Sequence, residues 1–257
     1  GYKAITKLQE LKAYIDQAIS AGFVAYDSEC DSLDTLSAKM IGFSLCYEKG
    51  KAVYIPIQQS SEDLFNQTEY IEEKDALEQL IRLFTDSKVK IIMHNAKFDL
   101  KLLLARWKKI TKADNFDFNL LNLNLSDTMI IAWLLNPEHL GKNGYSLEYL
   151  GETMLGLKGI EFKDIVQKGQ TFADVALENA YKYAAEDADF TYQLYLNLKE
   201  KWDKECQKHD KEQMNSLLSM EMKVLPILTK MELTGIHLDS ENLKNYNLEL
   251  TKGIEEA

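Results

Sequence analysis

The chain has 257 residues, of which 46% are hydrophobic and 28% charged, a composition typical of a globular protein with a full core. Its net charge of −11 argues against a free-standing, high-affinity duplex DNA binder, because phosphate contacts need a positive surface. No apolar run reaches the roughly 18 residues of a membrane span, and three dispersed cysteines favour a reducing, intracellular compartment over a disulfide framework. Because residue 1 is Gly rather than Met, we expect it to be a processing or cloning boundary.

The first half of the chain alternates between helical and strand patterns. The expected elements are, in order, an amphipathic helix over residues 3–20, a strand over 22–26 that runs into acids, a hairpin of strands 40–47 and 52–57, a helix over 72–84, a buried strand over 89–93 and a helix over 97–107. Strands that alternate with helices predict an α/β protein whose sheet has at least one parallel pair.

The second half is expected to be mostly helical. The expected elements are a variable loop at 113–124, a helix from a cap at Ser126-Asp127 to Leu135, a helix over 146–155, a turn at 156–170, a long helix from about Phe172 into the charged stretch 199–211, a helix over 214–233, and a last helix opened by Asp239. The charged stretch is the best candidate for a domain boundary.

One Asp-x-Glu tripeptide, Asp27-Ser28-Glu29, directly continues an expected strand. Residues two apart in a strand share a face, so both carboxylates are expected to point the same way. The tripeptide alone is weak evidence in a chain with 41 acids, since residues 203–205 and 239–241 also match it. The first of these lies in a charged helical run. The second fits an N-cap with a first-turn acid on the helix dipole.

Asp99 stands beside His94 and Asn95 where an expected strand leads into a helix, and α/β sheets place functional sites at such junctions. The alternative is that Asn95 only caps the helix and that Asp99 is only a favourable first-turn acid.

Tyr183 and Asp187 lie four residues apart on an expected helix, so their side chains share one face. Glu186 and Asp189 fall on other faces, and we expect both to be solvated. If Asp187 converges with the acids of the earlier blocks, the carboxylates repel one another and require cations. Hard oxygen ligands favour Mg²⁺ or Mn²⁺, and a pair of such ions suits the hydrolysis of a phosphodiester.

The three blocks, in this order and on these elements, resemble the 3′–5′ proofreading exonuclease domain of family-A DNA polymerases of the bacterial DNA polymerase I type. The motifs that carry the resemblance are residues 27–34 (DSECDSLD), 95–99 (NAKFD) and 183–189 (YAAEDAD). Ser28 and Cys30 replace the family's usual threonines, and neither change removes an acid. Residues 220–239 are similar to the opening of the polymerase domain at the base of its thumb.

The resemblance implies a ribonuclease H-like fold, with an exonuclease domain over residues 1–205 and a truncated helical start of the polymerase domain over 206–257. It implies two divalent ions, Mg²⁺ with Mn²⁺ as a substitute, that act on a single-stranded DNA 3′ end and release 5′-mononucleotides. The implied metal ligands are Asp27, Glu29, Asp99 and Asp187, and these four with Tyr183 form the implied catalytic set. The implied substrate contacts are Leu33, Asn95 and Phe162, and without the resemblance Leu33 and Phe162 read equally well as core residues.

The resemblance further implies a monomer without membrane contact, joined to the polymerase domain of its own parent chain. Its expected place is the bacterial cytoplasm near the nucleoid, with an organellar polymerase as the alternative. Three alternatives remain open at this point. The domain could be a scaffold without activity, although all four acids and the tyrosine are present. It could be a standalone RNA-trimming nuclease, although residues beyond 214 look polymerase-like. The acidic surface alone also permits a protein-interaction module.

Overall fold

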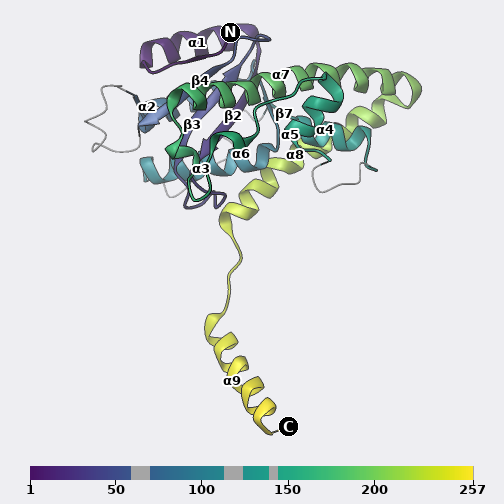
Figure 1. Cartoon of the computed structure of the whole chain (residues 1–257). Helices are drawn as coiled ribbons and strands as arrows, with labels where there is room; N and C mark the ends of the chain where they lie inside the picture. The colour runs from purple at the N-terminus through teal and green to yellow at the C-terminus, as the bar shows by residue number, and fades with distance from the viewer. Residues whose placement is uncertain (59–69, 113–123, 139–143, 257) are drawn as a thin grey trace.

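A computed structural model describes residues 1–58, 70–112, 124–138 and 144–256. These residues form a mixed seven-stranded sheet with helices on both faces, which confirms the expected α/β class (Figure 1). The variable loop expected at 113–124 lies outside the described residues except for its last position. None of the described helices is both long enough and apolar enough to cross a bilayer.

The sheet is built from β1 (Lys3–Ala4), β2 (Phe23–Cys30), β3 (Met40–Cys46), β4 (Val53–Gln58), β5 (Ile71–Glu72), β6 (Lys90–Met93) and β7 (Leu125–Asp127). Their order is β1-β4-β3-β2-β6-β7, with β5 beside β4. Strands β3 and β4 are antiparallel, as the hairpin pattern predicts, and β2 is also antiparallel to β3. The other pairings are parallel.

The helices are α1 (Leu8–Ala21), α2 (Glu73–Phe84), α3 (Ala96–Thr111), α4 (Thr128–Leu135), α5 (Leu147–Leu150), α6 (Phe162–Ile165), α7 (Leu177–Lys208), α8 (Lys211–Thr234) and α9 (Ser240–Glu256). Helices α1, α2 and α3 bury one face of the sheet in the main core. Helix α7 packs on the opposite face against β2 and β3. The central strand β2 therefore lies between two helical layers.

Several expected boundaries are wrong. The long helix expected from about Phe172 begins at Leu177, after a 3-10 helix at Phe172–Asp174. Residues 3–4 form β1 rather than the start of the first helix, because Lys3 and Ala4 pair with β4 and Ile5 is buried next to them. The helix expected over 146–155 changes after α5 into a π-helical turn at Gly151–Leu155. The turn expected at 156–170 contains α6. At residues 3–4, pairing in the sheet overrides the local helical pattern.

An open edge on β2 creates the space for a site. On β2, only Phe23, Val24 and Ala25 pair with β6, because β6 ends at Met93 and the chain turns into α3. Beyond Ala25 the pairing of β2 continues on the β3 side alone. The second half of β2 thus faces the first turn of α3, on the side where β6 has ended.

The C-terminal helices differ in how they are anchored. Helix α8 buries Leu225 and Thr229 against the body of the protein. Helix α9 buries none of its described residues and lies away from the body after an extended connection (Figure 1).

Candidate active site

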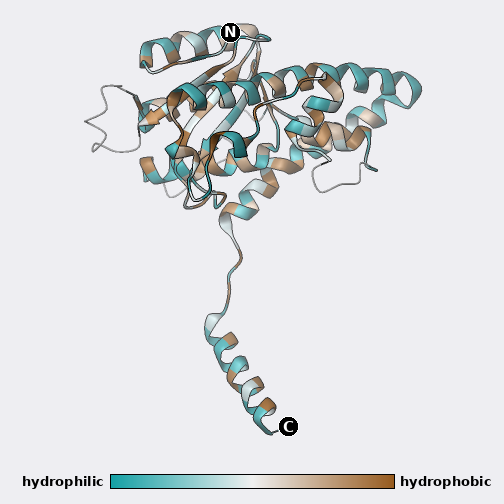
Figure 2. Ribbon diagram, in the orientation of Figure 1, coloured by the Kyte–Doolittle hydropathy of each residue, from teal (hydrophilic) through white to brown (hydrophobic). Residues whose placement is uncertain are grey.

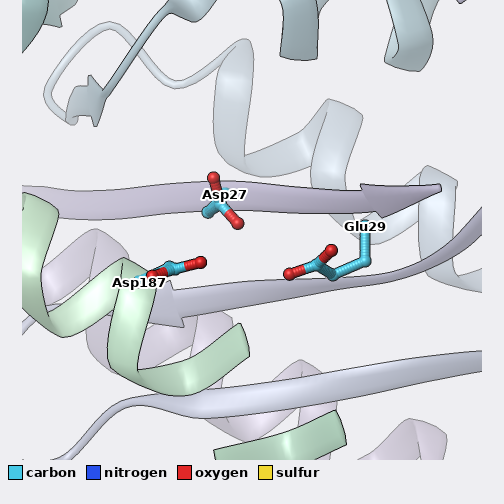
Figure 3. A group of neighbouring side chains, drawn as sticks. All are labelled: Asp27, Glu29 and Asp187. Carbon is cyan, nitrogen blue, oxygen red and sulfur yellow. The ribbon is translucent and has the colours of Figure 1, made fainter. Parts of the chain in front are cut away.

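Strand β2 and helix α7 bring three carboxylates together. Asp27 and Glu29 are two apart on β2, on the face that α7 covers, and Asp187 extends from α7 (Figure 3). One oxygen from each of the three lies within 4.8 Å of the other two. The expected convergence of the first and third acidic blocks is therefore present, at a spacing that suits a shared cation.

Asp99 contacts β2 from helix α3, not from α7. It is 3% exposed on the first turn of α3, and its Oδ1 accepts hydrogen bonds from the Ser28 backbone nitrogen at 3.1 Å and from the Ser28 Oγ at 2.5 Å. Ser28 lies between Asp27 and Glu29. Asp99 is thus tied to the same stretch of strand, but it is not one of the three converging carboxylates.

The electrostatics of the cluster are those of crowded, buried acids. Burial raises the pKa of Asp27 to about 7. Burial also raises the pKa values of Glu29, Asp99 and Asp187 well above their ordinary values, and repulsion from Asp27 adds to each of these shifts. Because a nearby cation reverses this penalty, the donor set fits a divalent metal ion. Carboxylate oxygens alone fit a hard ion such as Mg²⁺ or Mn²⁺.

Tyr183 lies one turn before Asp187 on the same face of α7. A hydrogen bond from its hydroxyl lowers the pKa of Asp187, against the larger effect of burial. Burial and the nearby negative charge of Asp187 raise the pKa of Tyr183. The phenol therefore stays protonated near neutral pH and acts as a hydrogen-bond donor, not as a base.

A cavity of about 300 Å³ opens over these groups. Its lining comes from β2, α3, α4, α5 and α7, and it consists of Asp27, Ser28, Glu29, His94, Asn95, Phe98, Asp99, Met129, Ser146, Leu147, Glu148, Tyr183 and Asp187. All four expected acids and the tyrosine thus line one cavity. Glu148 and His94 belong to it as well, although only their position in the fold reveals this.

Asn95 lines the cavity in an unusual backbone conformation. It has φ 65° and ψ 48°, in the left-handed region that Asn tolerates better than most residues. It occupies the N-cap position of α3, yet its side chain makes no capping hydrogen bond there. The interpretation of Asn95 as a simple cap is therefore wrong.

The two other expected substrate contacts are exposed side chains, which rules out the alternative that they belong to the core. Phe162 is 45% exposed, and its ring packs edge-on against Tyr183 with the ring centroids 6.2 Å apart. Leu33 is 88% exposed on the loop that follows β2, and it does not line the cavity.

Glu186 and Asp189 were expected to be solvated, and this prediction is wrong. Glu186 is half-buried and accepts a hydrogen bond from the Ile160 backbone nitrogen at 2.6 Å. Asp189 is 3% exposed and accepts from the Tyr2 hydroxyl at 2.8 Å and from the Gly50 nitrogen at 2.8 Å. The faces of α7 away from the cavity are covered by distant segments, so helical spacing alone could not show that these acids are buried.

Comparisons with known proteins show the family to which the chain belongs. A family model described as a 3′–5′ exonuclease matches residues 2–203. DNA polymerase I of Treponema pallidum is 33% identical over 270 residues, covering 92% of this chain and 25% of its own length. DNA polymerase I of Borreliella burgdorferi is 35% identical over 244 residues, covering 95% and 24%. The chain thus spans about a quarter of the length of these curated relatives.

Solved structures share the fold at low identity. The POL domain of Pol1 from M. smegmatis, in complex with a DNA primer-template and dNTP, superposes with a TM-score of 0.68 at 17% identity, covering 99% of this chain and 36% of that one. Escherichia coli RNase D, an exoribonuclease involved in structured RNA processing, superposes with a TM-score of 0.57 at 16% identity, covering 86% and 50%. These neighbours confirm the ribonuclease H-like arrangement of the sheet and its helices.

The family match, the polymerase relatives and the shared fold lead to one assignment. The chain belongs to the 3′–5′ exonuclease family that forms the exonuclease domain of DNA polymerase I-type enzymes.

Proposed function

We propose that this chain removes 5′-mononucleotides from single-stranded or mismatched DNA 3′ ends, as the proofreading domain of a DNA polymerase I-type enzyme. The observation that carries the proposal is the convergence of Asp27, Glu29 and Asp187 within 4.8 Å, next to the Tyr183 hydroxyl. This donor set fits two divalent ions, Mg²⁺ with Mn²⁺ as a substitute.

Asp27, Glu29 and Asp187 would hold one ion, Asp27 would be shared with the second, and Asp99 would contribute through water. Bound at this place, the ions supply an activated water near neutral pH and neutralise the charge on the leaving 3′ oxygen. The protonated Tyr183 and the Glu29 carboxylate orient the attacking water. This alignment of the water lowers the barrier to its attack, and neither side chain needs to act as a strong base.

The terminal nucleotides would contact Leu33, Asn95 and Phe162. The exposed Phe162 ring, held edge-on by Tyr183, offers a face for base stacking, which is worth about 1–3 kcal/mol per base and accepts any sequence. Leu33 is free to press against a terminal base, since its side chain is exposed beside the end of β2. Asn95 is available as a hydrogen-bonding group, because its side chain does not cap α3.

We further propose that residues 1–205 form the exonuclease domain and that residues 206–257 are the start of the polymerase domain. Exposed apolar side chains recur at helical spacing along α8, at Leu217, Met220, Val224, Ile227, Leu228 and Met231, which suits a surface covered by the rest of a polymerase. The protein would be a monomer that works in the bacterial cytoplasm at the nucleoid.

The test is digestion of matched DNA and RNA 3′ overhangs with Mg²⁺, with Mn²⁺ and with EDTA, and chromatography of the products. We expect stepwise release of 5′-mononucleotides from DNA that EDTA abolishes. Equal or faster trimming of RNA would indicate a ribonuclease instead, because only the 2′-OH distinguishes the two substrates. No cleavage of either, in a folded protein, would indicate a scaffold without activity.

Thermal unfolding tests the metal site without activity. Binding to the folded state alone stabilises it by about 2.7 kcal/mol at a hundredfold excess of free ion over Kd. We expect Mg²⁺ to raise the melting temperature of the wild type, and Asp187→Asn to lose most of that rise. An equal rise in both proteins would place the bound ion elsewhere.

A further inference from the structure

Asp127 at the end of β7 makes contacts that its role as a helix cap does not account for. Its carboxylate is 2% exposed and caps α4, as the sequence predicts, with Oδ1 accepting from the nitrogens of Met129 at 2.8 Å and Ile130 at 3.3 Å. The same carboxylate also accepts from Asn95 at 3.3 Å and from Ala96 at 2.7 Å. Asp127 therefore caps two helices that enter from different parts of the chain.

The second set of hydrogen bonds acts on the wall of the cavity. The first backbone N–H groups of a helix have no partner inside the helix, and the residue at the N-cap usually supplies one from its own side chain. At α3 the N-cap residue is Asn95, one of the best capping residues, yet Asp127 from β7 supplies the acceptor instead. The amide of Asn95 is thereby left to the cavity that it lines.

The backbone of Asn95 depends on the same contact. A left-handed conformation is uncommon outside glycine, and it persists where the surrounding structure holds it. The bond from the Asn95 nitrogen to Asp127 Oδ1 holds this residue, and the bond from the next nitrogen to Oδ2 fixes the start of α3. Asp99, whose carboxylate binds Ser28, follows one turn later on α3.

We propose that Asp127 is a positioning residue for the exonuclease reaction, which replaces Asn95 as the cap of α3 so that the Asn95 amide is free to bind the terminal nucleotide. This inference rests on the proposed function. Asp127 does not line the cavity and is not itself a catalytic residue. It acts through Asn95.

The experiment is a double-mutant cycle on exonuclease kinetics with a 3′-ended DNA oligonucleotide, using the wild type, Asp127→Asn, Asn95→Ala and the double variant. In Asp127→Asn, an amide replaces one of the two acceptor oxygens, so the start of α3 loses part of its anchor. We expect kcat/KM to fall by about 10- to 100-fold in each single variant, mainly through KM. The kcat/KM of the double variant should lie within about threefold of that of the less active single variant, because both changes remove the same contact of Asn95 with the terminal nucleotide.

A matched control separates positioning from stability. Asp210 caps α8 with the same pair of bonds, from the nitrogens of Glu212 at 2.9 Å and Gln213 at 3.0 Å, away from the cavity. Asp210→Ala removes this cap, so it should lower the melting temperature and leave KM unchanged well below that temperature. If Asp127→Asn behaves in the same way, or if its effect on kcat/KM multiplies that of Asn95→Ala, the inference is wrong.

If Asp127→Asn does not fold, amide hydrogen exchange of the wild type tests whether Asp127 holds the start of α3. The Ala96 amide lies in the first turn of α3, where exchange is normally fast, and the bond to Asp127 should slow it about as much as amides inside the helix. Fast exchange at Ala96 would overturn the inference. A wild type without exonuclease activity would overturn the proposed function instead, and this exchange result would still decide whether Asp127 holds α3.

Discussion

The tripeptide Asp-Ser-Glu occurs twice in this protein, at residues 27–29 and at residues 239–241, and the two copies have different surroundings. In β2 the two acids lie on the face covered by α7 and meet a third carboxylate. At the start of α9 all three residues are exposed, and Asp239 accepts a hydrogen bond from the Asn242 nitrogen at 2.9 Å. The same three residues therefore make a candidate metal site in one place and an ordinary helix cap in the other.

The regions that hold the two copies differ in the same way. The described residues before α9, here called the body, bury their apolar side chains in one large core and three smaller clusters. Helix α9 leaves Leu243, Tyr246, Leu250 and Ile254 exposed along one side, and Figure 2 shows hydrophobic residues along α9 with no neighbouring element over them. Chemistry that depends on desolvation and crowding is thus possible in the body and not at α9.

The largest expected difference lies between matched variants of the two tripeptides. Asp27→Ala removes the carboxylate shared by the proposed ions, and we expect exonuclease activity to fall by about a thousandfold or more. Asp239→Ala should change activity less than twofold and leave the melting temperature unchanged, because it removes only the exposed cap of a helix that buries none of its described residues. Steady-state digestion of a DNA 3′ end measures the first effect and thermal unfolding the second. Metal-dependent cleavage at near-normal rate in Asp27→Ala would show that the site is elsewhere.

In the absence of metal ions, the stability of the protein should depend on pH through the buried acids of β2 and not through the exposed acids of α9. The folded-state pKa of Asp27 is about 7, against 3.8 for the free group, so between these values the folded protein holds a proton that the unfolded chain has released. Stability must therefore fall as pH rises through this window, by up to about 1.4 kcal/mol per pH unit for each such group. Melting temperatures in EDTA should decline from pH 5 to pH 8, and Asp27→Asn should decline less.

Excess Mg²⁺ should flatten the same curve, because the ion binds the ionised carboxylates and offsets their repulsion. Asp239→Asn is the control, and its curve should follow the wild type in both buffers. A wild-type curve in EDTA that is flat or rises with pH would mean that these acids are not crowded in the folded protein.

Tyr183→Phe should have a moderate effect. The phenylalanine keeps the ring that packs against Phe162 and Phe172 but removes the hydroxyl that hydrogen-bonds Asp187. We expect a roughly tenfold lower kcat, equivalent to about 1.4 kcal/mol, with little change in the melting temperature. A loss as large as that of Asp27→Ala would mean that Tyr183 does more than align the attacking water.

Removal of α9 should have the smallest effect. A chain that ends at Thr234 loses no buried side chain among the described residues, so its melting temperature and exonuclease rate should match those of the full chain. Leu225→Ala on α8 is the contrast, since that side chain is 4% exposed in the main core and its truncation should cost about 2–5 kcal/mol. Marked destabilisation on loss of α9 would show that the exposed side of this helix packs against the body in solution.

Much of this protein follows from its sequence. The strand pair β3 and β4, helix α2, the Asp127 cap of α4 and the break at Gly235 between α8 and α9 all correspond to local patterns of apolar spacing, turns and caps. These patterns act within a few residues, so the sequence displays them directly. The spacing of Asp27 from Glu29 and of Tyr183 from Asp187 belongs to the same class.

Only the tertiary structure decided which acids share a space and which polar groups remain free. Asp99 is tied to Ser28 across 71 residues, and Asp189 to Tyr2 across 187. Asn95 does not cap its own helix because Asp127, 31 residues from Ala96, does so. The physical reason is that burial and partnership depend on what packs against a side chain from elsewhere in the chain, and local periodicity carries no information about that neighbour.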